Sequence, residues 1–241
     1  MTALSLLLAG AASCAAAAPP SLAVRVYDGR TPYARVMAVP DGAETSSNGR
    51  VSPAGAAALE LSAKALAVPD PDHGGATVVQ YQVELSGGPG VEGRLLQASG
   101  ALALRPGSPV KAVQCGAWTL ELDLDDGAPR VALPGFGAAD GNLSVTLDLG
   151  GGSVVCRQVL KAKSRGAVVD GILSGGKKGG VVMNLAPTPA PEGVLLDYGF
   201  RHDPIGVPGF SLQRKASLAL GTKASLGGYH LDLLVEGDAA P

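Results

Sequence analysis

Aromatic residues are scarce in this sequence: Phe, Trp and Tyr together make up 4% of its 241 residues. Hydrophobic residues as a whole still reach 46%, which is enough to form a buried core and argues against a disordered chain. The core must therefore consist mainly of Val, Leu and Ala. A sugar-binding platform built from stacked aromatic rings is disfavoured for the same reason.

The sequence also lacks an excess of charge of either sign and lacks long apolar runs. Nineteen basic residues stand against 21 acidic ones, for a net charge of −2. This near-neutral balance argues against nucleic acid as a partner. Beyond the N-terminal segment no run reaches the ~20 apolar residues of a transmembrane helix, so we expect the mature chain to be soluble or anchored only at its start.

Motifs for catalysis, cofactors and metals are missing as well. The sequence contains no G-x-S-x-G motif, and the Gly- and Lys-rich segment 174–180 does not have the spacing of a phosphate-binding loop. Its three histidines are His73, His202 and His230, and none has the spacing of a metal-binding motif. We therefore assign no catalytic residue, cofactor or metal ligand.

One group of acidic residues offers the oxygen ligands that calcium prefers, although the spacing of an EF-hand is absent. Alternation along a strand is the simpler explanation, because it places Asp123 and Asp125 on the solvent side. The members of the group are Asp123, Asp125, Asp126, Asp140 and Asp148.

The first residues have the features of a secretory signal peptide. A short apolar run leads to Ala15-Ala16-Ala17, which predicts removal of residues 1–17 by cleavage before Ala18. The run has no Lys or Arg before it, which is unusual for such a segment. An alternative is a lipid anchor at Cys14, although Ala11 stands where lipoproteins usually carry Leu.

Loss of Cys14 with the signal peptide would leave two cysteines, Cys115 and Cys156. An even pair in an exported chain favours a disulfide, which would close a loop of about 40 residues. Two buried free thiols are the alternative.

Alternating hydrophobic residues are clearest in the segment 113–160. Trp118, Leu120, Leu122 and Leu124 share one face of a predicted strand. Cys115 has the opposite parity, which predicts either a β-bulge or a strand break at Gly116.

About twelve short strands follow from such alternation and from turn signals, supplied by 35 Gly and 18 Pro. The segment 54–68 has features of both helix and strand, and its alternation favours strand. Segments 44–49 and 171–180 are expected as loops, and 187–191 as a polyproline-type connector. The expected strands are 22–27, 33–39, 77–85, 93–98, 101–104, 118–124, 143–149, 154–162, 181–185, 194–200, 210–220 and 229–235.

This pattern predicts an all-β, antiparallel, jelly-roll-like β-sandwich over residues 18–241. Two smaller sandwiches that divide near residues 187–191 are the alternative. The functional prediction is a secreted or periplasmic structural or binding module of the cell envelope, without catalytic activity and with a protein or carbohydrate partner at the cell surface. The alternative function is a secreted carbohydrate-active hydrolase on the same fold, which would need converging carboxylates or a histidine–carboxylate set in a concave face.

Overall fold

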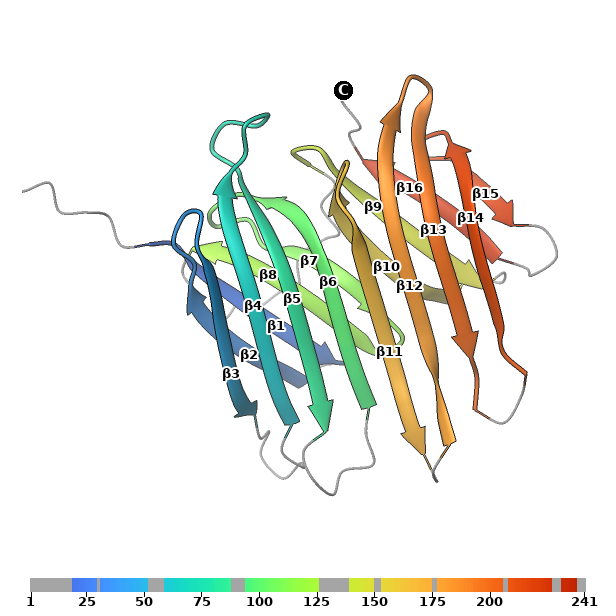
Figure 1. Ribbon diagram of the computed structural model, residues 1–241, viewed down its shortest axis with the longest axis horizontal. Coiled ribbons are helices and arrows are strands. Elements are labelled where there is room, and N and C mark those ends of the chain that lie inside the picture. Colours follow the sequence, from blue (N-terminus) through green and yellow to red (C-terminus); the bar gives the residue numbers. More distant parts are fainter. Residues whose placement is uncertain are drawn as a thin grey trace, which may run out of the picture.

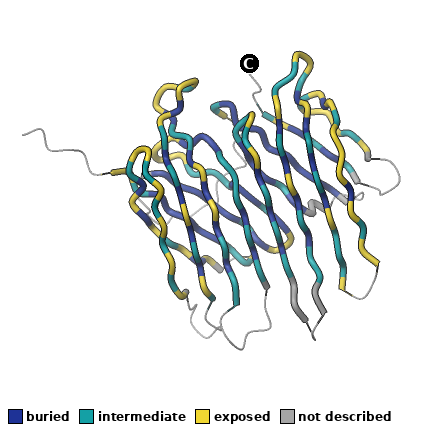
Figure 2. Tube along the Cα trace, in the orientation of Figure 1, coloured by how far each residue is buried: buried dark blue, intermediate teal, exposed yellow. Residues whose placement is uncertain are grey.

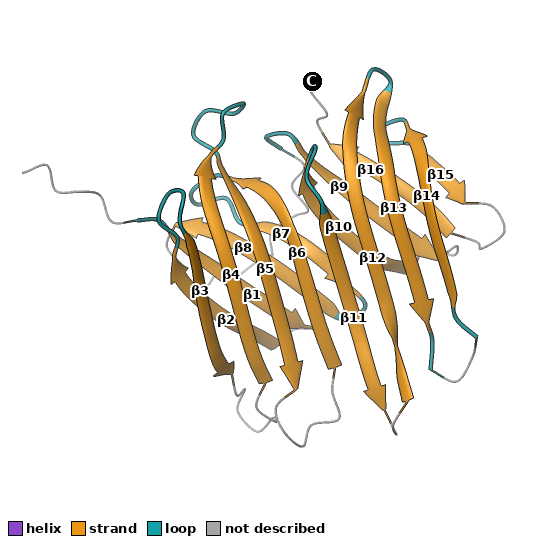
Figure 3. Cartoon of the chain, in the orientation of Figure 1, coloured by secondary structure: helices purple, strands orange, loops and turns teal. Residues whose placement is uncertain are grey.

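Two antiparallel β-sheets pack face to face in the computed structural model of this chain (Figure 1). The structure describes residues 19–29, 31–51, 59–87, 94–125, 139–149, 153–174, 177–205, 208–226 and 231–237. Strands connected by turns and loops account for all of these residues, and no helix occurs among them (Figure 3). The predicted all-β antiparallel sandwich is confirmed. The predicted signal peptide and Cys14 lie outside the described residues.

Sheet A, the rear layer in Figure 1, has the strand order β15-β16-β9-β10-β7-β8-β1-β2. Its strands are β1 (Ser21–Asp28), β2 (Thr31–Ala38), β7 (Val110–Cys115), β8 (Trp118–Asp125), β9 (Asn142–Leu149), β10 (Ser153–Lys161), β15 (Lys223–Leu226) and β16 (Leu231–Gly237).

Sheet B, the front layer, has the order β14-β13-β12-β11-β6-β5-β4-β3. Its strands are β3 (Glu44–Val51), β4 (Leu59–Pro69), β5 (Thr77–Gly87), β6 (Arg94–Leu104), β11 (Gly166–Ser174), β12 (Lys177–Ala190), β13 (Gly193–Asp203) and β14 (Phe210–Leu218).

The order of strands is palindromic. Strands β1–β8 fill one half of each sheet and β9–β16 the other half, so that each strand of the first half has a counterpart at the mirrored position of the second. The halves meet where β6 pairs with β11 in sheet B and where β7 pairs with β10 in sheet A. We call this boundary the seam. It passes through the middle of both layers and divides the chain between β8 and β9.

Pro187 and Pro189 lie inside β12 rather than in the connector that the sequence suggested. They pair with Leu196 and Val194 of β13, and the segment 187–191 belongs to the β12–β13 hairpin. Pairing of β12 with β11 ends at Leu185, so neither proline has a strand on its other side. Proline is tolerated at such edge-like positions because it cannot donate a hydrogen bond.

Other differences from the sequence prediction have similar causes. The polar segment 44–49, expected as a loop, lies in β3, which is an edge strand and can expose hydrophilic residues on its outer side. The expected loop 171–180 is largely the β11–β12 hairpin, of which residues 175–176 lie outside the described residues. Two predicted strands, 93–98 and 101–104, form the single strand β6. Strand β4 confirms the strand interpretation from Leu59 onward.

The core between the sheets consists mainly of Leu, Val and Ala, as the composition predicted. The inward row of β8 is Trp118, Leu120, Leu122 and Leu124, all buried. Cys115 pairs directly with Trp118 across a two-residue turn, in which Gly116 has φ of 55°. Only glycine readily adopts this left-handed conformation. The strand break at Gly116 is therefore confirmed, and Cys115 faces inward like Trp118.

Candidate functional site

The predicted disulfide joins Cys115 of β7 to Cys156 of β10. The two cysteines are register partners with Cα atoms 4.2 Å apart. Their strands belong to different halves, so the bond fastens the seam in sheet A.

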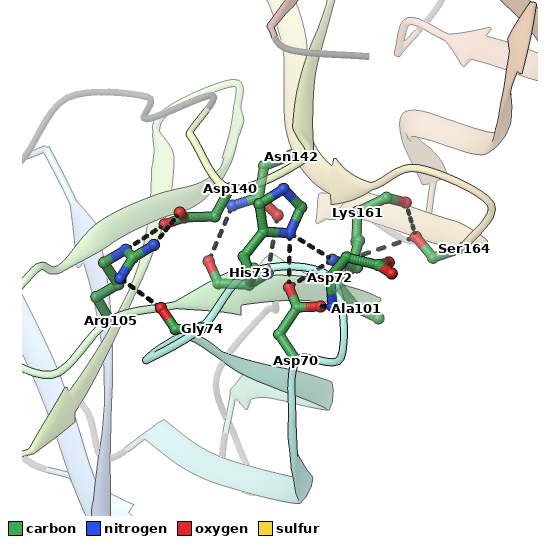
Figure 4. A network of polar contacts seen from close by, with 11 residues as sticks. Asp70, Asp72, His73, Gly74, Ala101, Arg105, Asp140, Asn142, Lys161 and Ser164 are labelled. Carbon is green, nitrogen blue, oxygen red and sulfur yellow. Dashed lines mark hydrogen bonds and ion pairs between the residues drawn. The ribbon is translucent and has the colours of Figure 1, made fainter. Parts of the chain in front are cut away.

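A second set of contacts fastens the seam at one end of the sandwich (Figure 4). The buried Asp70 carboxylate accepts hydrogen bonds from Lys161 Nζ at 2.5 Å, from His73 Nδ1 at 3.2 Å and from the Asp72 backbone N–H at 3.1 Å. Asp70 and His73 follow β4 in the first half, whereas Lys161 ends β10 in the second. We call the residues of this region the end cluster: Asp70, His73, Arg105, Asp140, Asn142 and Lys161.

Two further contacts of the end cluster cross the seam. Arg105 donates to both oxygens of Asp140, at 2.9 and 2.6 Å. Asn142 uses its side-chain amide as a strand would use its backbone: Nδ2 donates to the Ala103 carbonyl and Oδ1 accepts from the Ala103 N–H, both at 2.8 Å. The pairing of β6 with β11 ends at Ser99, so Asn142 supplies a partner where the neighbouring strand stops.

The electrostatics of the end cluster favour a structural role. Burial by itself raises the pKa of the Asp70 carboxyl, but the hydrogen bonds from Lys161, Asp72 and His73 and the positive charge of Lys161 together outweigh burial, so the pKa is lowered. The hydrogen bond from Arg105 lowers the pKa of Asp140 in the same way. Both carboxylates are held ionised by their partners, which suits the joining of two segments better than proton transfer.

The histidines do not come together. His73 belongs to the end cluster, whereas His202 lies in β13 beside the rings of Phe200 and Phe210. His230 lies outside the described residues. No group of three or more His, Cys, Asp or Glu side chains within the described ranges could hold a metal ion.

The acidic group is also dispersed. Asp140 pairs with Arg105, and Asp148 lies 3.5 Å from Lys223 Nζ. Asp123 was expected on the solvent side, but it is fully buried and lies 3.2 Å from Arg25, which also binds Glu121 at 2.5 Å. The side chain of Asp125 and the whole of Asp126 lie outside the part of the chain that the structure describes.

The outer faces of the two sheets differ in burial (Figure 2). In sheet A, β9 is buried on both faces from Asn142 to Asp148. In sheet B, burial alternates along the strands, as in β4 and β5, so one face packs on the core and the other is accessible. A ligand can therefore reach sheet B.

A row of mostly polar residues crosses this accessible face. Its members are register partners on eight successive strands, and most carry an amide or hydroxyl group or a very small side chain. The row, which we call the polar row, consists of Ser46, Lys64, Gln82, Ser99, Ala167, Asn184, Gly199 and Gln213. Amides and hydroxyls both donate and accept hydrogen bonds, so the row offers both functions over the whole width of the sheet.

Two adjoining depressions lie along the polar row, and a third lies beside them. Two have volumes of about 460 Å³ each and share Ser99 and Arg165, and a third of about 290 Å³ adjoins them at Arg165. The first is lined by the first half with Ser164 and Arg165, and the other two mainly by the second half. We call the three together the central hollow. It spans the seam, so neither half forms it alone.

Cations outnumber anions in the central hollow. Lys64, Lys163, Arg165 and Lys215 stand against Glu44 and Asp197, which gives a local charge of +2 on a chain whose net charge is −2. Glu44 lies 4.0 Å from Lys64, and Asp197 lies 3.5 Å from Lys215. Lys163 and Arg165 are exposed and have no ion pair within the part of the chain that the structure describes.

Sequence reasoning missed this surface. Alternation in the expected strand 77–85 indicates which of its sides is polar, but the alignment of Gln82 with Ser99, Asn184 and Gln213 depends on strand register. The only early signal was the alternation of Gln80, Gln82 and Glu84 with apolar residues in β5.

Comparison with family models, with curated proteins and with solved structures finds no match for this chain. Within the described residues, no helix has the length and apolar character needed to cross a membrane.

Proposed function

We propose that this protein is an exported binding module of the cell envelope or cell surface, which binds a carbohydrate in the central hollow of sheet B and carries out no catalysis. The observation that supports this function is the polar row with its adjoining depressions. Five amide or hydroxyl side chains, spread from β3 to β14, suit an extended ligand that presents many hydroxyl groups.

A protein partner is less well supported by this surface. Extended peptides usually bind at the edge of a sheet, where backbone groups are unpaired. The central hollow lies instead in the middle of sheet B, where β6 and β11 already pair with each other. Recognition there has to use side chains, which suits a glycan.

Binding to polysaccharides tests the proposal. We would measure retardation of the full-length protein in native gels that contain one soluble polysaccharide each. At least one polysaccharide should retard the protein, and Ser99→Trp should abolish the retardation because a bulky ring would fill two of the depressions. Ser211→Trp is the control, since Ser211 is exposed on the same sheet outside the hollow. If none of the polysaccharides retards the protein, the proposal is rejected.

A hydrolase is the second candidate, and one observation favours it. Glu60 and Glu84 line a separate depression of about 500 Å³ beside β3. Paired carboxylates are the usual machinery of glycoside hydrolysis. Glu60, however, is exposed and bonded to Arg50, and Glu84 accepts a hydrogen bond from Gln97 Nε2. Neither lies in the apolar environment that makes a carboxyl group a general acid at neutral pH.

Release of reducing ends from the same polysaccharides separates the two candidates. A binding module should release none above the background of a heat-denatured sample. Release that disappears in Glu84→Gln would establish the hydrolase instead.

Export is a part of the proposal with its own test. The intact mass of the native protein, measured with and without reduction and alkylation, should correspond to a chain that begins at Ala18 and gains two alkylated thiols only after reduction. A full-length mass with three free thiols would place the protein in a reducing compartment.

A further inference from the structure

We propose that the carbohydrate bound in the central hollow is acidic, a polysaccharide with carboxylate groups, and that Lys163 and Arg165 bind these carboxylates. This inference rests on the proposed function and specifies its ligand. It is based on the position of the two cations, on the pairing of the other charges and on the kind of side chain that lines the hollow.

Position is the first argument. Arg165 lines all three depressions, and Lys163 lines the smallest of them. Both belong to the short connection between β10 and β11, which crosses from sheet A to sheet B at the seam. A ligand that extends from one half of the hollow to the other must pass Arg165.

Pairing of the remaining charges is the second argument. The two acidic residues of the hollow, Glu44 and Asp197, each have a lysine nearby, at 4.0 and 3.5 Å respectively. The positive charge that remains on Lys163 and Arg165 is thus not neutralised by the side chains of the hollow. An arginine guanidinium binds a carboxylate through two parallel hydrogen bonds, which makes it selective for this group.

The lining is the third argument. Among the described residues no Trp or Phe lines the hollow, and the Tyr81 ring beneath it is buried. Sugars without charge would have to bind here without the stacking that aromatic residues provide. Charge-assisted hydrogen bonds from the two cations are the strongest contacts that this surface offers.

The test compares two polysaccharides with the same sugar backbone, of which only one carries free carboxylates. Binding of polygalacturonate and of its fully methyl-esterified form, which lacks the carboxylate charge, is measured by titration calorimetry with the full-length protein. We expect binding of polygalacturonate, at least tenfold weaker binding of the ester, and loss of affinity as NaCl is raised from about 0.1 to about 1 M, because salt screens exposed charges.

Variants assign the effect to the proposed residues. Arg165→Gln should weaken the binding of polygalacturonate about tenfold, the magnitude typical of one charge-assisted hydrogen-bond pair, and Lys163→Gln should weaken it further in the double variant. The control is Arg201→Gln, which removes an exposed arginine of the same sheet that lines none of the three depressions. All three positions are exposed, so unchanged thermal unfolding verifies that each variant folds.

The outcomes separate this inference from the proposed function. Equal binding of both polysaccharides, or binding that Arg165→Gln leaves unchanged, would overturn the acidic ligand while leaving a carbohydrate-binding module. Binding of poly-L-glutamate as tight as that of polygalacturonate would overturn it in favour of an acidic peptide. Absence of binding to every polysaccharide would reject the proposed function and the inference together.

Discussion

Replacement of Asn142 by Ala should destabilise the protein, because Asn142 is the hydrogen-bond partner of a buried part of β6. The side chain is buried and satisfies both the N–H and the C=O of Ala103, at 2.8 Å each. Strand β11 does not reach this part of β6, so Ala would leave two backbone groups unpaired in the interior. Each buried group without a partner costs about 1–3 kcal/mol, so two such groups predict a loss of about 2–6 kcal/mol in the free energy of unfolding.

Equilibrium unfolding in urea measures this loss. The midpoint should fall while the slope of unfolding free energy against urea stays unchanged, because the surface exposed on unfolding is the same. Asn184→Ala is the control: Asn184 is exposed in the polar row, and its loss should change stability by less than about 0.5 kcal/mol. A loss below about 1 kcal/mol in Asn142→Ala would refute the view that Asn142 replaces the missing strand.

Three further predictions concern stability. Replacement of both Cys115 and Cys156 by Ala should lower the free energy of unfolding by about 4 kcal/mol, because the bond closes a loop over a sequence separation of 41 residues; equal unfolding midpoints for the variant and the oxidised protein would contradict this. Arg25→Met should lower the free energy of unfolding by about 3–5 kcal/mol, because it leaves the buried Glu121 and Asp123 without this cation. The control in the same urea titration is Arg50→Met, which removes an exposed partner of Glu60 and should cost less than about 1 kcal/mol. The third prediction concerns stability at low pH. The lowered pKa of Asp70 means that its stabilisation is present above the unfolded-state pKa near 4 and is lost as the pH falls through the folded-state pKa. The difference in thermal stability between the wild type and Asp70→Asn should therefore shrink as the pH falls below about 4, and a difference that stays constant down to pH 2 would show that Asp70 is not the titrating group.

Several of the contacts that these predictions concern join the two halves of the palindromic arrangement. The disulfide and the end cluster, together with Gln158, which reaches from β10 to the Ser99 carbonyl at 2.8 Å, all join the first half to the second. The central hollow lies over the same boundary. Weakening the seam should therefore affect ligand binding as well as stability, whereas changes at edge positions that do not line the hollow, such as Ser211 of β14, should affect neither strongly.

Alternation of residues along each strand was sufficient to predict the fold class. Trp118, Leu120, Leu122 and Leu124 could be placed on one buried face because side chains of a strand point alternately to its two sides, a property of the local backbone. The pairing of Cys115 with Cys156 was likewise predictable, because only one partner remained once Cys14 was set aside.

Tertiary structure decided where the polar residues of these strands lie. Asp123 has the pattern of a solvent-facing residue, and only the position of Arg25 on the neighbouring strand β1 shows why it can be buried. The polar row exists because register aligns Gln82, Ser99, Asn184 and Gln213, residues that are up to 131 positions apart in the sequence. Hydrophobic alternation specifies which side of a strand is polar, but not which strands become neighbours. Sequence alone therefore determined a sandwich with Val, Leu and Ala in its core, whereas pairing between distant strands produced the seam, the end cluster and the central hollow.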